Sequence, residues 1–268
     1  MLTNSGSRRK PEKKTSRTLS SMTVCVTAAV ASLGLATPAG AVVGGERAST
    51  SDYPWVMRVD NGNKIGCGGT LVAPTKVLTA AHCITTAEPG ATFKVIAGED
   101  RYDGTGGDRV AVTGYWVHPH AENPPAGQPR VDLAVLTLAR PLSQQPLLIA
   151  APHDADLYRT GRTGIALGWG ADSEHGTPPS EWLRQATIPV TTPEECSKWF
   201  PNESGKSAFC AGGNGKGVAL GDSGGPLVIG GKLAGVVSGG ASSEYGKLPA
   251  KFTDISKFSD QLAQQIRS

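Results

Sequence analysis

The sequence predicts an all-β protein made of two six-stranded antiparallel β-barrels followed by a C-terminal helix. Glycine and proline are frequent, at 35 and 19 of 268 residues. The apolar runs are short, and Gly, Pro, Asn or Asp occupies nearly every gap between them, which is typical of strands joined by turns. Two series of about six strands suit two closed barrels, because closure leaves few unpaired strand edges. The predicted strands are 55–59, 70–72, 77–80, 93–97, 110–117, 133–138, 164–167, 182–190, 207–211, 226–229, 233–238 and 251–253.

The two barrel halves are expected to span about 42–150 and 151–268, joined through the segment 142–159. The end of the chain has a different pattern, because apolar residues recur there at three- and four-residue spacing. Asp254 and Ser256 are candidate caps at its start. The apolar positions of the predicted C-terminal helix are Ile255, Phe258, Leu262 and Ile266.

Residues 1–41 have the three parts of an export signal. A basic segment is followed by an apolar stretch from about Met22 to Leu35 and by the small residues Ala39-Gly40-Ala41. The apolar stretch is shorter than the roughly 20 residues that a membrane-spanning helix needs. We expect cleavage after Ala41 and a secreted, extracellular mature protein; the alternative is an uncleaved tail or anchor. The composition of the signal suggests export of the bacterial type.

Removal of the signal changes the charge of the protein. The whole chain has 26 basic and 23 acidic residues, and residues 1–41 contain six of the basic ones and one of the acidic ones. The mature chain therefore carries a net charge of about −2, which gives no reason to expect a nucleic-acid partner. We also expect no membrane contact after cleavage, and a monomer.

Four cysteines remain once Cys25 leaves with the signal. These are Cys67, Cys83, Cys196 and Cys210, and four cysteines allow three pairings. Export places them in an oxidising compartment, and their spacing is not that of a zinc site. The simplest proposal pairs neighbours, Cys67 with Cys83 and Cys196 with Cys210.

Three motifs contain the residue types needed for nucleophilic catalysis. A serine becomes a nucleophile when a base takes its proton and a carboxylate orients that base. His82 lies in Thr-Ala-Ala-His-Cys at a predicted strand end, and Asp132 begins the apolar run Asp-Leu-Ala-Val-Leu. Ser223 lies in the glycine-rich run Gly-Asp-Ser-Gly-Gly-Pro-Leu, where backbone N–H groups could bind an oxyanion.

These motifs, their order, the start Val42-Val43-Gly44-Gly45 and the segment Gly168-Trp169-Gly170 resemble the trypsin/chymotrypsin family of serine proteases. The resemblance covers essentially the whole mature chain. It implies an endopeptidase that acts on proteins or peptides through an acyl-enzyme, with an active site between the barrels. By this resemblance His82 is the general base, Asp132 orients it and Ser223 is the nucleophile. The N–H groups of Gly221 and Ser223 would form the oxyanion hole.

The resemblance also implies an ion pair between the new α-ammonium group of Val42 and the carboxylate of Asp222. Export cleavage after Ala41 would expose Val42 directly. We therefore expect an enzyme that is active on secretion without a separate pro-segment. The alternative is that Asp222 is only a turn residue.

The specificity pocket departs from the trypsin pattern. Gly217 stands where trypsins carry the aspartate that binds Lys or Arg, so we expect an uncharged, apolar-preferring pocket instead. Ala219 replaces a bracing cysteine and Gly239 a usual tryptophan, so the pocket is either braced by other packing or mobile. Glu244 is interpreted as a solvated loop charge. The expected lining is Gly217, Val218, Leu220, Ser238, Gly240 and Ala250.

Two further alternatives concern metal binding and activity. The acidic loop 99–103, with Asp108, lies where some relatives bind calcium, but its spacing favours a surface loop, and no metal or cofactor is expected. A catalytically weak or inactive homologue, acting as a secreted binding protein, is the main rival function. An esterase with a GxSxG elbow orders its triad Ser, Asp, His, whereas this chain has the order His, Asp, Ser.

Overall fold

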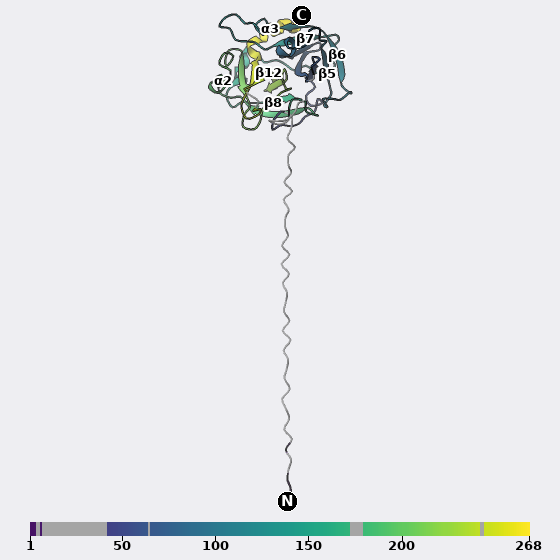
Figure 1. Ribbon diagram of the computed structural model, residues 1–268, viewed down its shortest axis with the longest axis vertical. Coiled ribbons are helices and arrows are strands. Elements are labelled where there is room, and N and C mark those ends of the chain that lie inside the picture. Colours follow the sequence, from purple (N-terminus) through teal and green to yellow (C-terminus); the bar gives the residue numbers. More distant parts are fainter. Residues whose placement is uncertain (4–5, 7–41, 64, 172–178, 242–243) are drawn as a thin grey trace. The chain divides into compact units, whose positions relative to one another are not determined.

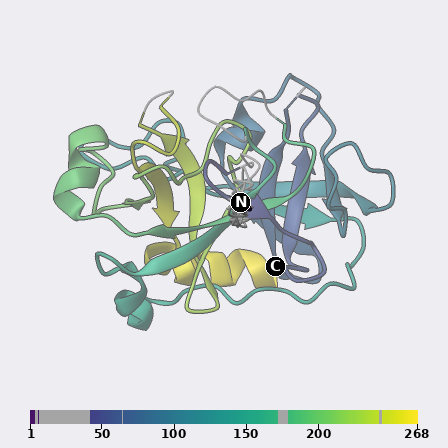
Figure 2. The same ribbon diagram turned by 90° about the horizontal axis from the view of Figure 1, so that it is seen from below.

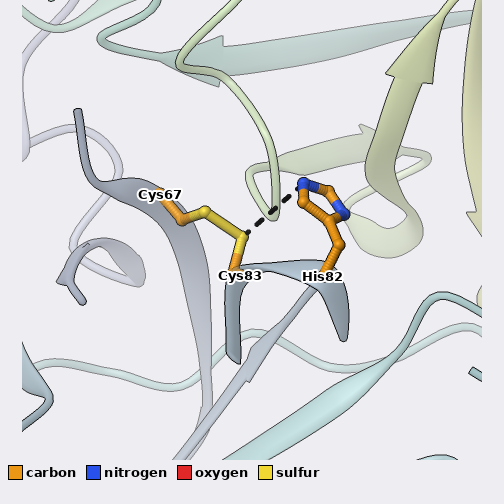
Figure 3. Close-up of side chains that lie close together, drawn as sticks. All are labelled: Cys67, His82 and Cys83. Carbon is orange, nitrogen blue, oxygen red and sulfur yellow. Dashed lines mark hydrogen bonds between the residues drawn. A yellow bond between two sulfur atoms is a disulfide. The ribbon is translucent and has the colours of Figure 1, made fainter. Parts of the chain in front are cut away.

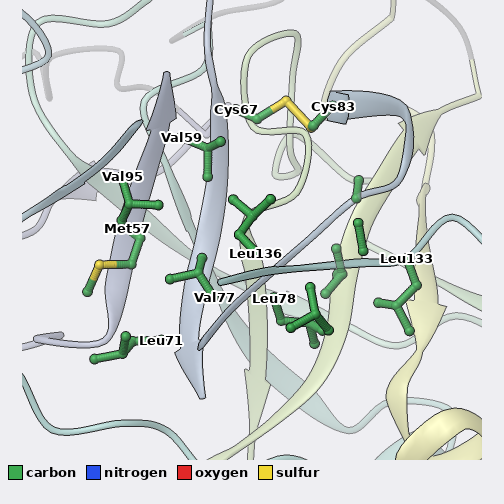
Figure 4. Close-up of a cluster of buried hydrophobic side chains, with 14 of the residues drawn as sticks. Met57, Val59, Cys67, Leu71, Val77, Leu78, Cys83, Val95, Leu133 and Leu136 are labelled. Atoms are coloured by element: carbon green, nitrogen blue, oxygen red, sulfur yellow. A yellow bond between two sulfur atoms is a disulfide. The ribbon is translucent and has the colours of Figure 1, made fainter. Parts of the chain in front are cut away.

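The first half of the chain from Val42 onward folds into a closed antiparallel barrel with strand order β2-β3-β4-β7-β6-β5. Buried Val, Leu and Met side chains fill it, among them Met57, Leu71, Val77 and Leu136 (Figure 4). Several of its strands are buried along nearly their whole length, as in β4 with all four residues buried, which agrees with the short apolar runs of the sequence. The strands are β2 (Val56–Asp60), β3 (Cys67–Ala73), β4 (Lys76–Thr79), β5 (Lys94–Ala97), β6 (Asp108–Val117) and β7 (Ala134–Leu138).

The second half forms a seven-stranded antiparallel sheet in the order β1-β9-β8-β11-β12-β13-β10. Six strands come from this half, and the seventh, β1, lies shortly after Val42, before the first barrel. A bridge between Val190 and Ala211 links the ends of β9 and β10, the first and last of the six. The strands are β1 (Glu46–Arg47), β8 (Thr163–Gly168), β9 (Arg184–Pro189), β10 (Ala208–Ala211), β11 (Pro226–Ile229), β12 (Lys232–Gly240) and β13 (Ala250–Asp254).

The computed structural model describes residues 1–3, 6, 42–63, 65–171, 179–241 and 244–268. The predicted apolar stretch Met22–Leu35 and the predicted cleavage site 39–41 lie outside the described residues, as does Cys25. Among the helices that are described, none has the length and hydropathy needed to cross a membrane.

The predicted C-terminal helix is present as a 3-10 turn, η2 (Ile255–Phe258), followed by α3 (Ser259–Arg267). The carboxylate of Asp254 caps η2 by accepting the N–H of Ser256 at 3.1 Å. Leu262 of α3 is buried in the core of the first barrel, so the end of the chain ties the second half to the first. Figure 2 shows α3 in yellow beside both halves.

Three further helical segments were not predicted from the sequence: α1 (His82–Thr85), η1 (Pro152–Tyr158) and α2 (Pro193–Trp199). A signal for α2 was present, because Thr192 accepts the N–H of Glu195 at 3.1 Å and proline occupies the first helical position.

The two halves meet where β3 begins and where the Gly-Asp-Ser-Gly-Gly run ends. The N–H of Gly68 donates to the carbonyl of Ser223 at 2.7 Å. A Cβ at Gly68 would lie 2.7 Å from the Cα of Gly225, so the two backbones touch without intervening side chains. This junction, between the blue strands of the first half and the green strands of the second (Figure 1), positions the candidate site.

Candidate active site

His82 and Asp132 form a tightly coupled pair. His82 begins α1, directly after β4, and the Nδ1 of its ring lies 2.7 Å from Oδ2 of Asp132. The other carboxylate oxygen, Oδ1, accepts the backbone N–H of His82 at 2.9 Å. Both oxygens of one carboxylate therefore hold one histidine, which fixes the ring orientation and favours the tautomer with its proton on Nδ1.

The surroundings of Asp132 favour its ionised form. Burial by itself opposes ionisation, but the hydrogen bonds and charge of His82, together with the hydroxyl of Ser238 at 2.8 Å, hold the pKa of Asp132 below its usual range. Thr253 Oγ1 donates to the backbone carbonyl of Asp132 at 3.0 Å. Sequence reasoning placed Ser238 only in the specificity pocket and missed its hydrogen bond to Asp132.

Two independent contacts bring the loop of Ser223 to this pair. Its carbonyl accepts the N–H of Gly68, the neighbour of Cys67, and Cys67 is disulfide-bonded to Cys83, the residue after His82. On its other side, Gly224 donates to the carbonyl of Val237, next to Ser238, at 2.9 Å. The three motifs thus meet in space although they are separated in sequence.

Within the described residues no hydrogen bond joins Ser223 to His82. The Nε2 of His82 lies 3.9 Å from the Sγ of Cys83 instead (Figure 3). Catalytic hydrogen bonds are often long before substrate binds, so this geometry is compatible with a proton transfer that tightens in the complex. Cys67, His82 and Cys83 lie close enough together to suggest a metal site. Because the two cysteines are bonded to each other in a disulfide, they offer no thiolate to a metal ion.

The backbone at Gly221 and Ser223 leaves two donors free. Gly221 has φ +95°, a conformation that glycine adopts without strain. In the part of the chain that the structure describes, neither the N–H of Gly221 nor that of Ser223 is donated to another protein group. Two unpaired N–H groups beside a candidate nucleophile are the donors that an oxyanion needs.

Asp222 is fully buried, and among the described residues its carboxylate accepts two hydrogen bonds, from the N–H groups of Gly170 and Ala219, both at 2.8 Å. Burial raises the pKa of Asp222 to about 7. A Cβ at Gly170 would lie 2.6 Å from Cγ of Asp222, which explains the Gly-Trp-Gly motif as space for this carboxylate. The side chain of Val42 is buried in the core of the second half.

The residues expected to line the specificity pocket lie on the loop 215–221, at the end of β12 and at the start of β13. Gly217, Val218 and Ala250 are buried, Gly240 is exposed, and Leu220 is half-exposed at 51%. The predicted disulfides Cys67–Cys83 and Cys196–Cys210 are present.

Ala219 stands where relatives have a bracing cysteine, and backbone contacts hold the loop that precedes it. The N–H of Gly215 donates to the carbonyl of Gly246 at 2.9 Å, and Gly217 donates to the carbonyl of Val43 at 3.1 Å. A Cβ at Gly217 would lie 3.2 Å from the Cα of Gly246, and one at Gly246 would lie 2.7 Å from Cγ1 of Val43. These contacts are of the kind that the braced alternative requires, and the choice between a braced and a mobile pocket stays a prediction.

A carboxylate introduced at the pocket floor is expected to destabilise this protein without producing a trypsin-like preference for arginine. In Gly217→Asp the new side chain presses on the backbone of Gly246, at an expected cost of about 1–3 kcal/mol for overpacking. Urea unfolding would measure the loss of stability, and cleavage of Arg peptides would measure specificity. Gly114→Asp, at a position of β6 where a new Cβ meets no atom within 4 Å, is the control. Unchanged stability with strong Arg cleavage in Gly217→Asp would contradict the expectation.

The carboxylates of the acidic loop 99–103 and of Asp108 are bound by other groups of the protein. Glu99 accepts the N–H of Gly106 at 2.8 Å and that of Arg101 at 3.1 Å. Asp100 accepts the N–H and the hydroxyl of Thr50, both at 2.6 Å. Asp103 and Asp108 are paired with Arg101 and Arg140. These contacts give each carboxylate a protein partner.

Comparison with known proteins places this site in a family. The family described as Trypsin matches residues 42–262. The chain is 36% identical over 230 residues to a trypsin of Saccharopolyspora erythraea, covering 85% of this chain and 99% of the relative. It is 29% identical to hypodermin-B of Hypoderma lineatum, covering 85% of this chain and 89% of that protein.

Among solved structures, the chain resembles neuropsin, a serine protease expressed in the limbic system of mouse brain. The TM-score is 0.72 at 26% identity, and the alignment covers 83% of this chain and 99% of neuropsin. Together with the barrel, the second sheet and the paired His82 and Asp132, these matches show that the chain is a serine endopeptidase that belongs to the trypsin family.

Proposed function

We propose that this protein is a secreted serine endopeptidase that cleaves peptide bonds through an acyl-enzyme, with His82, Asp132 and Ser223 as its triad. The observation that carries the proposal is the hydrogen bond of 2.7 Å between Nδ1 of His82 and Asp132. It leaves Nε2 as the only ring nitrogen free to take a proton from a hydroxyl.

The proposed reaction follows from the positions of these groups. Ser223 Oγ attacks the substrate carbonyl while His82 Nε2 takes its proton, and the ionised Asp132 stabilises the imidazolium that forms. The negative charge on the former carbonyl oxygen is bound by the free N–H groups of Gly221 and Ser223. His82 then protonates the leaving amine, and a water molecule, activated in the same way, hydrolyses the acyl-enzyme.

We infer an uncharged specificity pocket. Gly217 has no side chain, and its neighbour Val218 is buried and apolar. A cationic substrate side chain would lose its water there without gaining an anion, whereas Phe, Leu or Met would gain by burial.

Secretion, processing after Ala41 and a monomeric state complete the proposal. The substrates are proteins or peptides, and neither nucleic acid nor membrane is a partner of the mature enzyme. The export pattern of residues 1–41 and the charge of about −2 on the remainder support these inferences.

The test is hydrolysis of peptide p-nitroanilides that end in Phe, Leu, Ala, Arg or Glu by the exported protein. We expect turnover of the Phe and Leu substrates, and a loss of about 10⁴-fold or more in kcat for Ser223→Ala. Ser49→Ala, a serine outside the site, is the matched control. Arg cleavage would refute the uncharged pocket, and no turnover by folded, correctly processed protein would favour a binding protein instead.

A further inference from the structure

A polar cavity of about 160 Å³ adjoins the His82–Asp132 pair, and the proposed reaction does not use it. The residues that line it include His82, Asp132, Ser238, Arg130, Glu203 and Lys251. A ligand in this cavity would lie against the general base, so a substrate side chain that reaches it must be close in sequence to the scissile bond.

Gly239 leaves open space beside Lys251, one of the residues that line this cavity. In the β12–β13 ladder Gly239 is paired directly with Lys251, and directly opposed residues point to the same face of a sheet. A Cβ built at Gly239 meets no atom within 4 Å. The space beside Lys251 is therefore available to a ligand.

Arg130 gives the cavity a cation with unused donors. Its Nε donates to the carbonyl of Ala121 at 2.9 Å, which fixes the guanidinium. Within the described residues, no carboxylate lies within 4.0 Å of Arg130, whereas Lys251 lies 4.0 Å from Glu203. The free edge of an arginine matches a carboxylate in bidentate geometry.

The charges around the cavity change during the reaction. In the resting enzyme the formal charges of Arg130 and Lys251 balance those of Glu203 and Asp132. When His82 takes the proton of Ser223, the sum around the cavity rises to one positive charge. The matching negative charge develops on the substrate oxygen at Gly221 and Ser223, which do not line the cavity. A bound carboxylate is therefore stabilised more in the transition state than in the ground state, which raises kcat rather than only lowering KM.

We propose that this cavity binds a carboxylate-bearing side chain of the substrate, near the scissile bond, with Arg130 as the specificity-determining residue. The inference rests on the proposed function of the same site. It predicts a preference for Glu over the isosteric but uncharged Gln at one substrate position.

The test uses fluorogenic peptides with a fixed Phe directly before the scissile bond. In each pair of peptides, Glu or Gln occupies one of the three positions before this Phe or one of the three positions after the bond, and the rates of the two peptides are compared. We expect one position where kcat/KM is about tenfold higher for Glu, as expected of one charge-assisted hydrogen bond, mainly through kcat. The ratio should fall as NaCl increases from 50 to 500 mM, because salt screens a partly exposed pair.

Two variants test the assignment. Arg130→Gln should lower the Glu/Gln ratio to about 1 by removing the charged partner, and Gly239→Phe should lower it by filling the space beside Lys251. Arg162→Gln, an exposed arginine outside the cavity, is the matched control and should keep the ratio. A ratio of 1 or less at every position in enzyme that cleaves the Gln peptides would overturn the inference, as would a ratio unchanged in Arg130→Gln. Failure to cleave any of the peptides, Glu or Gln, would instead overturn the proposed function, and this inference with it.

Discussion

Asp132→Asn is expected to lower kcat by about 10⁴-fold while leaving the fold intact. Oδ1 of Asp132 accepts the backbone N–H of His82, so the carbonyl oxygen of an asparagine will take that place. The amide NH₂ then points at Nδ1 of His82, which must accept a hydrogen bond and therefore carries its proton on Nε2. In that tautomer the ring cannot take the proton of Ser223.

The measurement is kcat on a Phe p-nitroanilide across pH 6–10, with the far-UV circular dichroism spectrum as a check on folding. Asp108→Asn, which removes an exposed carboxylate paired with Arg140, is the control and should leave kcat unchanged. Activity near the wild-type value in Asp132→Asn would show that this carboxylate does not set the tautomer of the histidine.

Enzyme that begins at Val42 is expected to be at least about 100-fold more active than enzyme that retains Ala41, because a buried carboxylate without its cation costs several kcal/mol. Asp222 is fully buried with two N–H donors and is adjacent to Ser223. A free α-ammonium group at Val42 would supply the missing charge. Val42 also has φ +54°, a strained conformation for valine, and cleavage before it removes the carbonyl that causes the strain.

The same difference should appear in the pH dependence of stability. In the uncleaved chain burial raises the pKa of Asp222 from 3.8 to about 7. The stability that this group contributes is therefore fully present below about pH 4 and lost as the pH rises through 7. Cleaved enzyme keeps an ammonium partner for Asp222 over this range. The stability gap between the two forms should thus widen from pH 4 to pH 8.

Fusions that release either Val42 or Ala41 as the first residue provide the two proteins, and urea unfolding at pH 5 and pH 8 measures their stability. A Val42→Ile enzyme that starts at residue 42 is the matched control, because it keeps both the ammonium group and a buried aliphatic side chain. Equal activity of the two starts would exclude the predicted ion pair between Val42 and Asp222.

Local sequence patterns were sufficient for much of the fold. The strands were predictable because their apolar residues alternate or form short buried runs, and the C-terminal helix because Leu262 and its neighbours recur at helical spacing. The short helix α2 was missed, since its apolar pattern covers only two turns, although Thr192 and Pro193 marked its start. The addition of β1 to the second sheet was not foreseen, because a two-residue strand carries no periodic signal.

The sequence alone determined which residues form the candidate triad, because His82, Asp132 and Ser223 each lie in a recognisable local sequence motif. Only the tertiary structure decided what surrounds them: the hydroxyl of Ser238 on Asp132, the contact of Gly217 with Gly246, and the cavity between Arg130 and Lys251. The physical reason is the sequence separation over which each kind of information acts. Motifs and periodicity report on neighbours along the chain, whereas a hydrogen bond across 106 residues or an empty volume exists only once distant strands have packed.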